Sequence, residues 1–271
     1  MEGNRLALER VDMNKVRVII RKEWSEIFKN KYVLLSITLL PMLLVAIPLV
    51  FLYMTGNPNT PIDGVEDIAS APAFAGMDPR AAMQILIIQQ FMFYFLMMPL
   101  LIPTYIASYS IIGEKQQRTL EPLLATPMTV TELLLGKALS ALIPAVGVTW
   151  LGYAVYVIVS RFLTSAEVWS YIVSPIWVWA IILLGPLLGI LAISVGVMVS
   201  SRVNDVRVAE QISGMLVLPV VLVGLPLTAA QLLVSTTMFL IGLAVVVVVN
   251  VVLLVIAVRL FERETILTRW K

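Results

Sequence analysis

Residues 113–137, GEKQQRTLEPLLATPMTVTELLLGK, are the longest charged and polar interruption between two apolar segments of this chain. The flanking segments, 81–112 and 138–160, are each long enough to cross a bilayer, which takes about 20 apolar residues in a helix. Because irregular backbone cannot face lipid, uninterrupted runs of this length predict helices. The pattern therefore predicts an all-α polytopic membrane protein in which residues 113–137 lie at a membrane surface.

The composition of the whole chain supports this class. Hydrophobic residues make up 60% and charged residues 13%, with a mean hydropathy of +0.96. An ordinary soluble domain has roughly 45–50% apolar and about 25% charged residues. The chain has no Cys and no His, which excludes disulfides, thiol catalysis and the usual zinc or copper sites.

Six transmembrane helices follow from the apolar runs. Two stretches outside them also have clear character: residues 55–80 form a loop rich in Pro and Gly, and residues 259–271 form a charged tail. The second helix is expected to begin at Asp78-Pro79 and to bend near Pro99 and Pro103. Residues 225–237 fit either a re-entrant helix or a simple loop. The predicted spans are 32–54, 81–112, 138–160, 176–200, 208–226 and 238–258.

Residues 1–31 precede the first span and contain an amphipathic pattern. Apolar residues recur there at helical spacing, with basic residues largely on other faces. This pattern is typical of a helix lying in the membrane interface. A basic helix that is simply solvated is the alternative. The apolar residues are Val16, Ile19, Ile20, Trp24, Ile27 and Phe28.

The basic residues predict the orientation of the chain. All Lys and Arg residues except Arg80 and Arg161 fall in segments 1–31, 113–137, 201–211 and 259–271. Cytoplasmic loops carry the excess of Lys and Arg in membrane proteins. Both termini and residues 113–137 are therefore expected in the cytoplasm, and the 55–80 loop outside.

Few groups in the spans could carry chemistry. Ionisable side chains are missing near the span centres, which disfavours a secondary carrier, and no catalytic cluster marks an enzyme. Gly136-Lys137 does not complete a phosphate-binding loop, because Thr131 stands at the position of its first Gly, so this chain is not expected to bind ATP. Asn250, a lone amide in a Val-rich span, is expected to hydrogen-bond another helix rather than a substrate.

Small residues on one face of the fourth span predict close helix packing. The partner helix belongs either to this chain or to a second copy. These residues are Gly185, Gly189, Ala192 and Gly196.

The 113–137 segment has local signals of a rigid elbow. Glu114 and Arg118 stand at i, i+4 spacing, and the residue before Pro127 avoids the helical region, so a short helix should end at Thr126. Thr129 and Glu132 have the spacing of a capping box for the next helix. Leucines 120, 123 and 124 form a one-sided patch on the short helix. A hairpin resting on lipid headgroups is the alternative.

Segment 113–137 closely resembles the signature of ABC-2 type transporter permeases: an acidic residue, Thr-Leu-Glu, Leu-Leu-x-Thr-Pro and a Gly-Lys pair after the second span. Residues 21–41, RKEWSEIFKNKYVLLSITLLP, resemble the N-terminal connecting helix of the same family. The six-span layout also matches, so the likeness covers most of the chain.

The resemblance implies the permease subunit of an ATP-binding cassette exporter in a prokaryotic plasma membrane. It implies pairing with a second permease copy, identical or different, and with two separate subunits that bind ATP and magnesium; nucleic acid is not an expected partner. A scaffold or mechanotransmitting membrane subunit driven by the same ATPases is the main alternative, and a secondary carrier a weaker one. The implied coupling residues are Glu114, Arg118, Leu120, Glu121, Leu123, Leu124, Thr126 and Pro127, with Arg21, Trp24 and Phe28 on the connecting helix.

Overall fold

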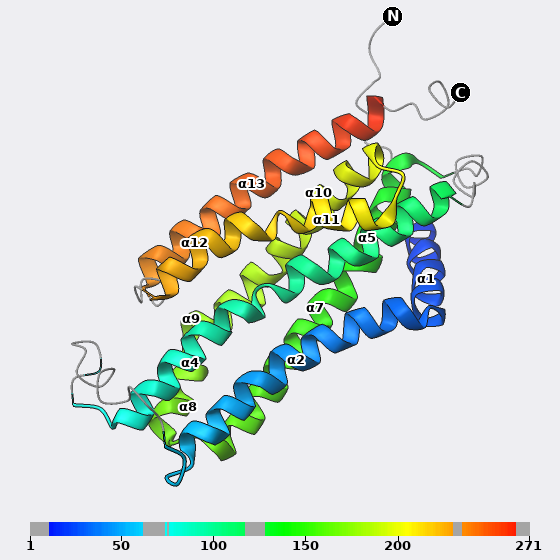
Figure 1. Cartoon of the computed structure of the whole chain (residues 1–271). Helices are drawn as coiled ribbons and strands as arrows, with labels where there is room; N and C mark the ends of the chain where they lie inside the picture. Colours follow the sequence, from blue (N-terminus) through cyan, green and yellow to red (C-terminus); the bar gives the residue numbers. More distant parts are fainter. Residues whose placement is uncertain (1–10, 62–73, 75, 117–127, 230–234, 264–271) are drawn as a thin grey trace, which may run out of the picture.

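The computed structural model describes residues 11–61, 74, 76–116, 128–229 and 235–263, and the elements assigned in them are all helical (Figure 1). Six stretches are long and apolar enough to cross a membrane: Ile37–Gly56, Pro79–Glu114, Thr131–Leu163, Ala166–Ser200, Val206–Gly224 and Thr236–Ala257. The predicted all-α class is confirmed, and so is the predicted number of helices long and apolar enough to span a membrane. The helices are α1 (Met13–Lys29), α2 (Lys31–Gly56), α4 (Pro79–Phe95), α5 (Met98–Gln116), α7 (Val130–Leu163), α8 (Ala166–Ile172), α9 (Pro175–Trp179), the π-helical turn η2 (Ala180–Leu184), α10 (Gly185–Arg202), α11 (Val206–Gly214), α12 (Val217–Ala229) and α13 (Thr236–Arg263).

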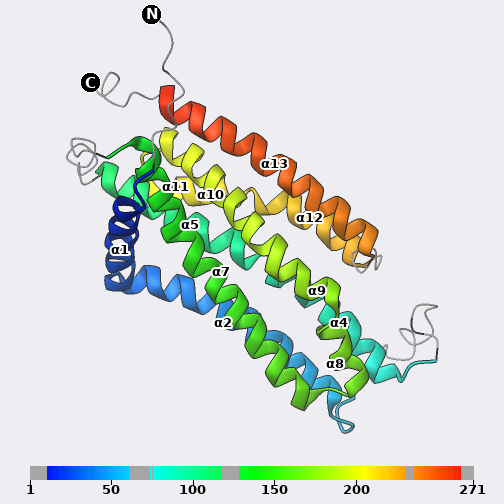
Figure 2. The ribbon, with the colours of Figure 1, turned by 180° about the vertical axis from the view of Figure 1, so that it is seen from behind.

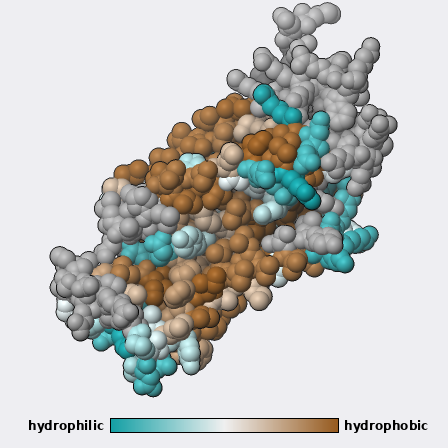
Figure 3. Space-filling view, in the orientation of Figure 1, coloured by the Kyte–Doolittle hydropathy of each residue, from teal (hydrophilic) through white to brown (hydrophobic). Residues whose placement is uncertain are grey.

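The spanning helices pack side by side, and α1 lies across one end of the bundle (Figures 1 and 2). We call this the α1 end; the opposite end, where the short helix α8 lies, is the α8 end. On the face shown in Figure 3, the described surface is mostly hydrophobic along the middle of the molecule, and hydrophilic residues gather towards its two ends. This distribution is the one expected of a bundle surrounded by lipid.

The second and the fifth spans each consist of two helices. The second span divides between Phe95 and Met98, and the fifth divides between Gly214 and Val217. In each case a proline follows shortly after the break, at Pro99 and at position 219, and lacks the N–H that would bond to the carbonyl four residues earlier. The sequence predicted a bend near Pro99 in one long helix; the structure instead ends α4 and starts α5. Other prolines, including Pro103, lie inside helices that continue through them.

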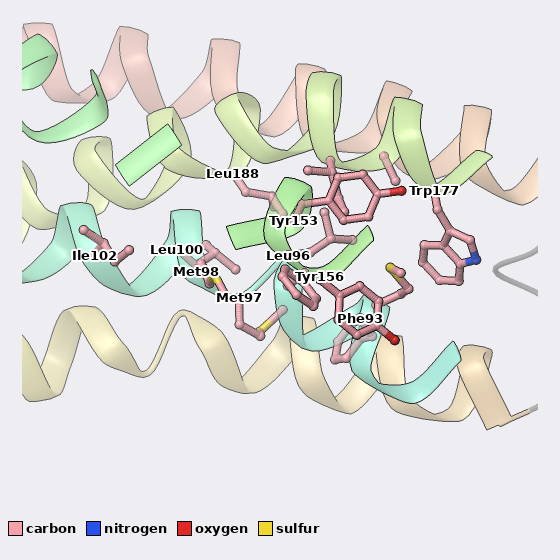
Figure 4. Packing of buried hydrophobic residues seen from close by; sticks show 14 of the residues in the cluster. Phe93, Leu96, Met97, Met98, Leu100, Ile102, Tyr153, Tyr156, Trp177 and Leu188 are labelled. Atoms are coloured by element: carbon pink, nitrogen blue, oxygen red, sulfur yellow. The ribbon is translucent and has the colours of Figure 1, made fainter. Parts of the chain in front are cut away.

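The two broken spans pack against each other, α5 on α11 and α4 on α12. Helix α12 approaches α4 closely, since a Cβ added to Gly224 would lie 2.0 Å from the Phe93 ring. The core continues between α4, α5, α7 and the α9–α10 segment (Figure 4). There the Phe95 ring centroid is 5.3 Å from that of Tyr156 and 6.1 Å from that of Tyr153.

Two polar side chains of the spans donate to backbone carbonyls of neighbouring helices. The Asn250 amide nitrogen of α13 donates to the Leu187 carbonyl of α10 at 3.0 Å, so the predicted helix-to-helix hydrogen bond is confirmed. The Trp150 indole donates to the Ile181 carbonyl, in the π-helical turn, at 3.3 Å. Proline 186 cannot donate a backbone hydrogen bond, and a π-turn interrupts the regular ladder, so neighbouring helices supply partners for carbonyls in this region.

Candidate functional site: an ion-paired junction of three helices

A group of charged side chains joins three helices at the α1 end. We call it the junction cluster: Lys22 and Glu23 of α1, Ser110 and Glu114 of α5, and Lys137 of α7. The residues from α1 and α7 are more than 100 positions apart in the chain, and α1 reaches its partners because it packs along α7 and the start of α2.

Lys137 is the centre of the junction cluster. Its Nζ lies 3.0 Å from Oε1 of Glu23, 2.8 Å from Oε2 of Glu114 and 2.6 Å from Oγ of Ser110. Lys137, Glu23 and Glu114 are only 6%, 2% and 6% exposed. One buried ammonium group therefore holds the middle of α1 and the last turns of α5 to α7.

Lys22 closes the junction cluster on its more exposed side. Its ammonium bonds to Glu114, lies 3.4 Å from Glu23 and 3.4 Å from Glu26. The buried carboxylates of Glu23 and Glu114 are thus each shared between two lysines. Replacing a buried ion pair by apolar residues is often neutral, but removing one partner leaves an uncompensated charge and costs about 3–5 kcal/mol. The junction cluster consequently fixes how α1, α5 and α7 meet more than it adds net stability.

The electrostatics of α1 agree with this geometry. Burial alone would raise the pKa of Glu23, but the Lys137 ammonium, the Ser110 hydroxyl and Lys22 lower that pKa below its ordinary value. Partial burial opposes the charge of Lys22, yet its hydrogen bond with Glu114 and the nearby carboxylates raise its pKa. Both groups are held in their charged forms around neutral pH.

Close backbone approach accompanies the ion pairs. A Cβ added to Gly136 would lie 2.7 Å from Cβ of Ile19, so only glycine lets α1 come this near to α7. One turn on, the Trp24 indole donates to the Ser140 carbonyl at 3.0 Å. Gly136 and Lys137 therefore form the contact site for α1 on α7. The absence of a side chain at Gly136 allows Ile19 to approach, and the Lys137 ammonium pairs with Glu23.

The start of α7 makes a second connection to α1. Thr129 and Glu132 form the predicted capping box, with the Glu132 N–H donating to the Thr129 hydroxyl at 3.2 Å and the Thr129 N–H donating to Glu132 at 2.9 Å. The same carboxylate accepts from the backbone N–H of Asp12 at 2.9 Å and pairs with Lys15 at 3.5 Å. The N-termini of α1 and α7 are thus tied through one side chain.

The predicted coupling and connecting residues fall in different places. Glu114 belongs to the junction cluster and Trp24 packs beside it, whereas Arg21 and Phe28 lie on the exposed face of α1. The segment that would form the short coupling helix joins the end of α5 to the start of α7. Arg118, Leu120, Glu121, Leu123, Leu124, Thr126 and Pro127 lie outside the described residues.

Sequence reasoning did not identify Glu23 or Lys137 as partners. The available signal was that Glu23 stands four residues after Ile19 and four before Ile27, on the apolar face of α1. A carboxylate on a buried face requires a cation or several donors. The sequence gives no means of choosing Lys137 among the lysines of the chain.

The small residues of the fourth span lie against helices of the same chain. A Cβ added to Gly189 would lie 2.6 Å from Leu142 of α7 and 3.4 Å from the Pro99 carbonyl of α5. A Cβ added to Gly196 would lie 3.4 Å from Cβ of Ala107 in α5, and a Cβ added to Gly185 would lie 3.8 Å from Cγ of Pro99. Ala192 on this face is fully buried. Helices α5 and α7, which meet at the junction cluster, are therefore both packed tightly on α10.

No group of three or more metal-binding side chains occurs among the described residues. In the described part of the chain, the charged groups of the junction cluster pair with one another.

In a comparison with known families, residues 17–239 match the model of a family described as ABC-2 family transporter protein. The match begins within α1 and ends within α13, and it includes every helix that contributes to the junction cluster. A comparison with curated proteins finds no match.

Proposed function

This chain belongs to the ABC-2 transporter family and is a membrane permease of an ABC transporter. We propose that it forms the pathway of an exporter, and that the junction cluster transmits movement from the ATP-binding subunits to the transmembrane helices. In this proposal two separate subunits bind ATP and magnesium, and a second permease copy completes the pathway. Both termini and the α1 end face the cytoplasm of a prokaryotic cell, in keeping with the basic residues gathered in segments 1–31, 113–137, 201–211 and 259–271.

The observation that carries the proposal is the position of the junction cluster. Segment 117–127, which would contact the ATP-binding subunits, connects α5 directly to the start of α7. Glu114 lies just before this segment, and Lys137 lies one helical turn into α7 beyond the capping box. A force applied to the segment would reach both helices at residues that are bonded to one another.

The strength of the joint determines what such a force would do. Lys137 bonds to residues of both α1 and α5, and separating one partner would leave a buried charge unpaired. The three helices are therefore expected to move as one unit at the junction cluster rather than slide past each other. Because α5 and α7 pack on α10, that movement would continue into the bundle.

A charge-exchange experiment tests this role. The chain has no cysteine, so Phe162→Cys, at an 83% exposed position near the end of α7, can carry the only fluorescent or spin label. In the complex with its ATP-binding subunits, ATP should change the signal of this label. Lys137→Glu should abolish the change while ATP hydrolysis continues, and adding Glu23→Lys should restore part of it. An unaltered response in Lys137→Glu would overturn the coupling role.

The segment outside the described residues has its own test. Leu123→Glu with Leu124→Glu would place two charges in the predicted contact with the ATP-binding subunits. The double variant should leave the α1 end folded and the label silent towards ATP. A normal response would remove these leucines from the coupling contact.

Flux distinguishes an exporter from a mechanotransmitting scaffold. Inside-out vesicles containing the complex should take up members of a panel of amphipathic fluorescent dyes when ATP is added outside, because the spans offer apolar surfaces to such molecules. A label that responds to ATP in vesicles without uptake of any dye would favour the scaffold.

A further inference from the structure

The side of α1 that faces away from the bundle has a composition of its own. We call it the outer face, and three of its apolar side chains, Met13, Val18 and Phe28, are 63%, 66% and 64% exposed. The opposite side of the same helix holds Val16, Ile19, Glu23 and Ile27, which are buried against the bundle. The outer face consists of Met13, Arg17, Val18, Arg21, Ser25, Phe28 and Lys29.

This arrangement differs from the expectation for an interfacial helix. The sequence suggested that the apolar stripe of Val16, Ile19 and Ile27 would enter the lipid. The structure turns that stripe inward onto α7 and α2. What remains for the surroundings is the basic side of the helix, with separate apolar side chains between the charges.

The charges of the outer face have one sign. Arg17, Arg21 and Lys29 are exposed, and no carboxylate in the described part of the chain forms an ion pair with them. The two glutamates of α1 are engaged elsewhere: Glu23 is buried beside Lys137, and Glu26 pairs with Lys22 at 3.4 Å. The outer face is thus a cationic surface.

The position of α1 relative to the membrane is set by the next helix. Only Asn30 separates the end of α1 from α2, and the apolar span in α2 begins by Ile37. At about 1.5 Å per residue, the six steps along the helix from Lys31 to Ile37 cover about 9 Å. The headgroup layer on each side of a bilayer is about 5–8 Å thick, so α1 lies at its level.

We propose that the outer face of α1 binds the headgroups of anionic phospholipids. The guanidinium groups of Arg17 and Arg21 stand four residues apart on one side of the helix and can bond to phosphate oxygens. The neighbouring Phe28, Met13 and Val18 can enter the boundary between headgroups and acyl chains. Each basic residue close to an anionic membrane raises binding roughly fivefold.

The experiment measures lipid enrichment at this face alone. Ser25 lies between Arg21 and Lys29 on the outer face, and Ser25→Cys can carry a single fluorophore because the chain has no cysteine. Headgroup-labelled nitroxide phosphatidylglycerol or phosphatidylcholine is then included in vesicles containing the full chain. Quenching by phosphatidylglycerol should exceed quenching by phosphatidylcholine at least threefold, and high salt should reduce the difference.

Variants separate charge from folding. Changing Arg17, Arg21 and Lys29 together to Gln should bring the quenching ratio near one, while Arg17→Lys with Arg21→Lys should keep most of it. These side chains are exposed, so thermal unfolding should change little. A fluorophore at Phe162→Cys, at the opposite end of α7, provides the control and should not respond to the triple change.

Two results would overturn the proposal. One is equal quenching by both lipids in the unaltered chain, or a ratio that the triple change leaves untouched. The other is a fluorophore at position 25 that both labelled lipids fail to quench once the ATP-binding subunits are added. That result would identify the outer face as a protein contact instead.

Discussion

The two ends of the bundle are held together by different kinds of interaction. At the α1 end, charged side chains of α1 pair with those of α5 and α7 across more than 90 residues of sequence. At the α8 end, the Arg80 guanidinium donates to four backbone carbonyls, those of Thr55 at 3.1 Å, Asn57 at 2.7 Å, Pro58 at 3.0 Å and Thr60 at 3.1 Å.

Further contacts at the α8 end are also to backbone. Gln84 donates to the Leu52 carbonyl at 3.1 Å, and a Cβ added to Gly56 would lie 3.1 Å from the Leu163 carbonyl. Arg80 and Gln84 thus bind carbonyls in the last turns of α2 and in the residues just after it. Arg80 and Gln84 at the α8 end bind backbone carbonyls across the α2–α4 hairpin, whereas the α1 end joins α1 to α5 and α7 through paired charges.

This difference predicts that the α1 end is much more sensitive to the loss of one charge. Lys137→Met removes one of the two lysines that Glu23 and Glu114 share in the described residues, and should lower the free energy of unfolding by about 3–5 kcal/mol. Thermal unfolding of the purified chain measures the effect. Lys29→Met on the outer face is the matched control and should change stability by less than about 0.5 kcal/mol.

Removing the orphaned carboxylates sharpens the same test. Adding Glu23→Gln and Glu114→Gln to Lys137→Met should recover most of the lost stability, because no buried charge then remains unpaired. If the Lys137→Met variant proves as stable as the Lys29→Met variant, the junction cluster does not hold α1, α5 and α7 together.

Steric fit at the α1 end is the next largest effect. Gly136→Ala would place a methyl group 2.7 Å from Ile19 and should cost about 1–3 kcal/mol as α1 is pushed from α7. Hydrogen exchange should increase along α1. Gly147→Ala, in the same helix with nothing within 4 Å of the added Cβ, should instead be neutral or stabilising. Equal effects of the two changes would mean that α1 does not dock at Gly136.

The α8 end should respond to loss of its arginine locally. Arg80→Ala removes four hydrogen bonds to carbonyls and should cost about 1–2 kcal/mol, since water replaces part of them at this half-buried position. Hydrogen exchange should rise in residues 55–61 and remain unchanged in α1. Faster exchange in α1 would show that the two ends are coupled.

The smallest expected difference between the two ends is in their response to acid. The pKa of Glu23 is lowered from its ordinary value of 4.5, so its stabilising contribution is present above that pH and is lost as the pH falls through the lower, folded-state pKa. The Lys22 contribution has the opposite sign: its raised pKa keeps it present at and below the ordinary value of 10.5, and it is lost only at higher pH.

The docking of α1 should therefore be constant from about pH 5 to 10 and weaken at lower pH. Hydrogen exchange of α1, corrected for the intrinsic pH dependence, measures this. The Arg80 contacts should persist, because neither guanidinium nor carbonyl groups titrate there. An α1 end that is insensitive to acid would indicate that Glu23 remains paired at any pH tested.

Much of the fold followed from the sequence because bilayer crossing imposes simple requirements. Long apolar runs can only be helices in lipid, so the class and the number of spans were predictable. The capping box at Thr129 and Glu132 was predictable because both partners lie within one helical turn. It was also predictable that Asn250 would form a hydrogen bond with another helix, because an amide among valines needs a partner.

Features that depend on contacts between distant residues were harder to predict from the sequence. The inward turn of the α1 apolar stripe could not be predicted, because lipid and protein offer an apolar side chain similar surroundings. Whether a proline bends a helix or ends it was equally undetermined: Pro99 follows a break, whereas Pro103 lies within α5. Neighbouring helices that satisfy or displace the freed carbonyl decide between these outcomes.

The sequence by itself determined the membrane class, the six helices and the ABC-2 signature around residues 113–137, because hydropathy and local spacing are properties of consecutive residues. Only the tertiary structure decided that Gly136 and Lys137 receive α1, and that Glu23 and Glu114 share one buried ammonium group. The physical reason is that an ion pair depends on a few ångströms of separation in space. The chain order leaves that separation open until the helices have packed.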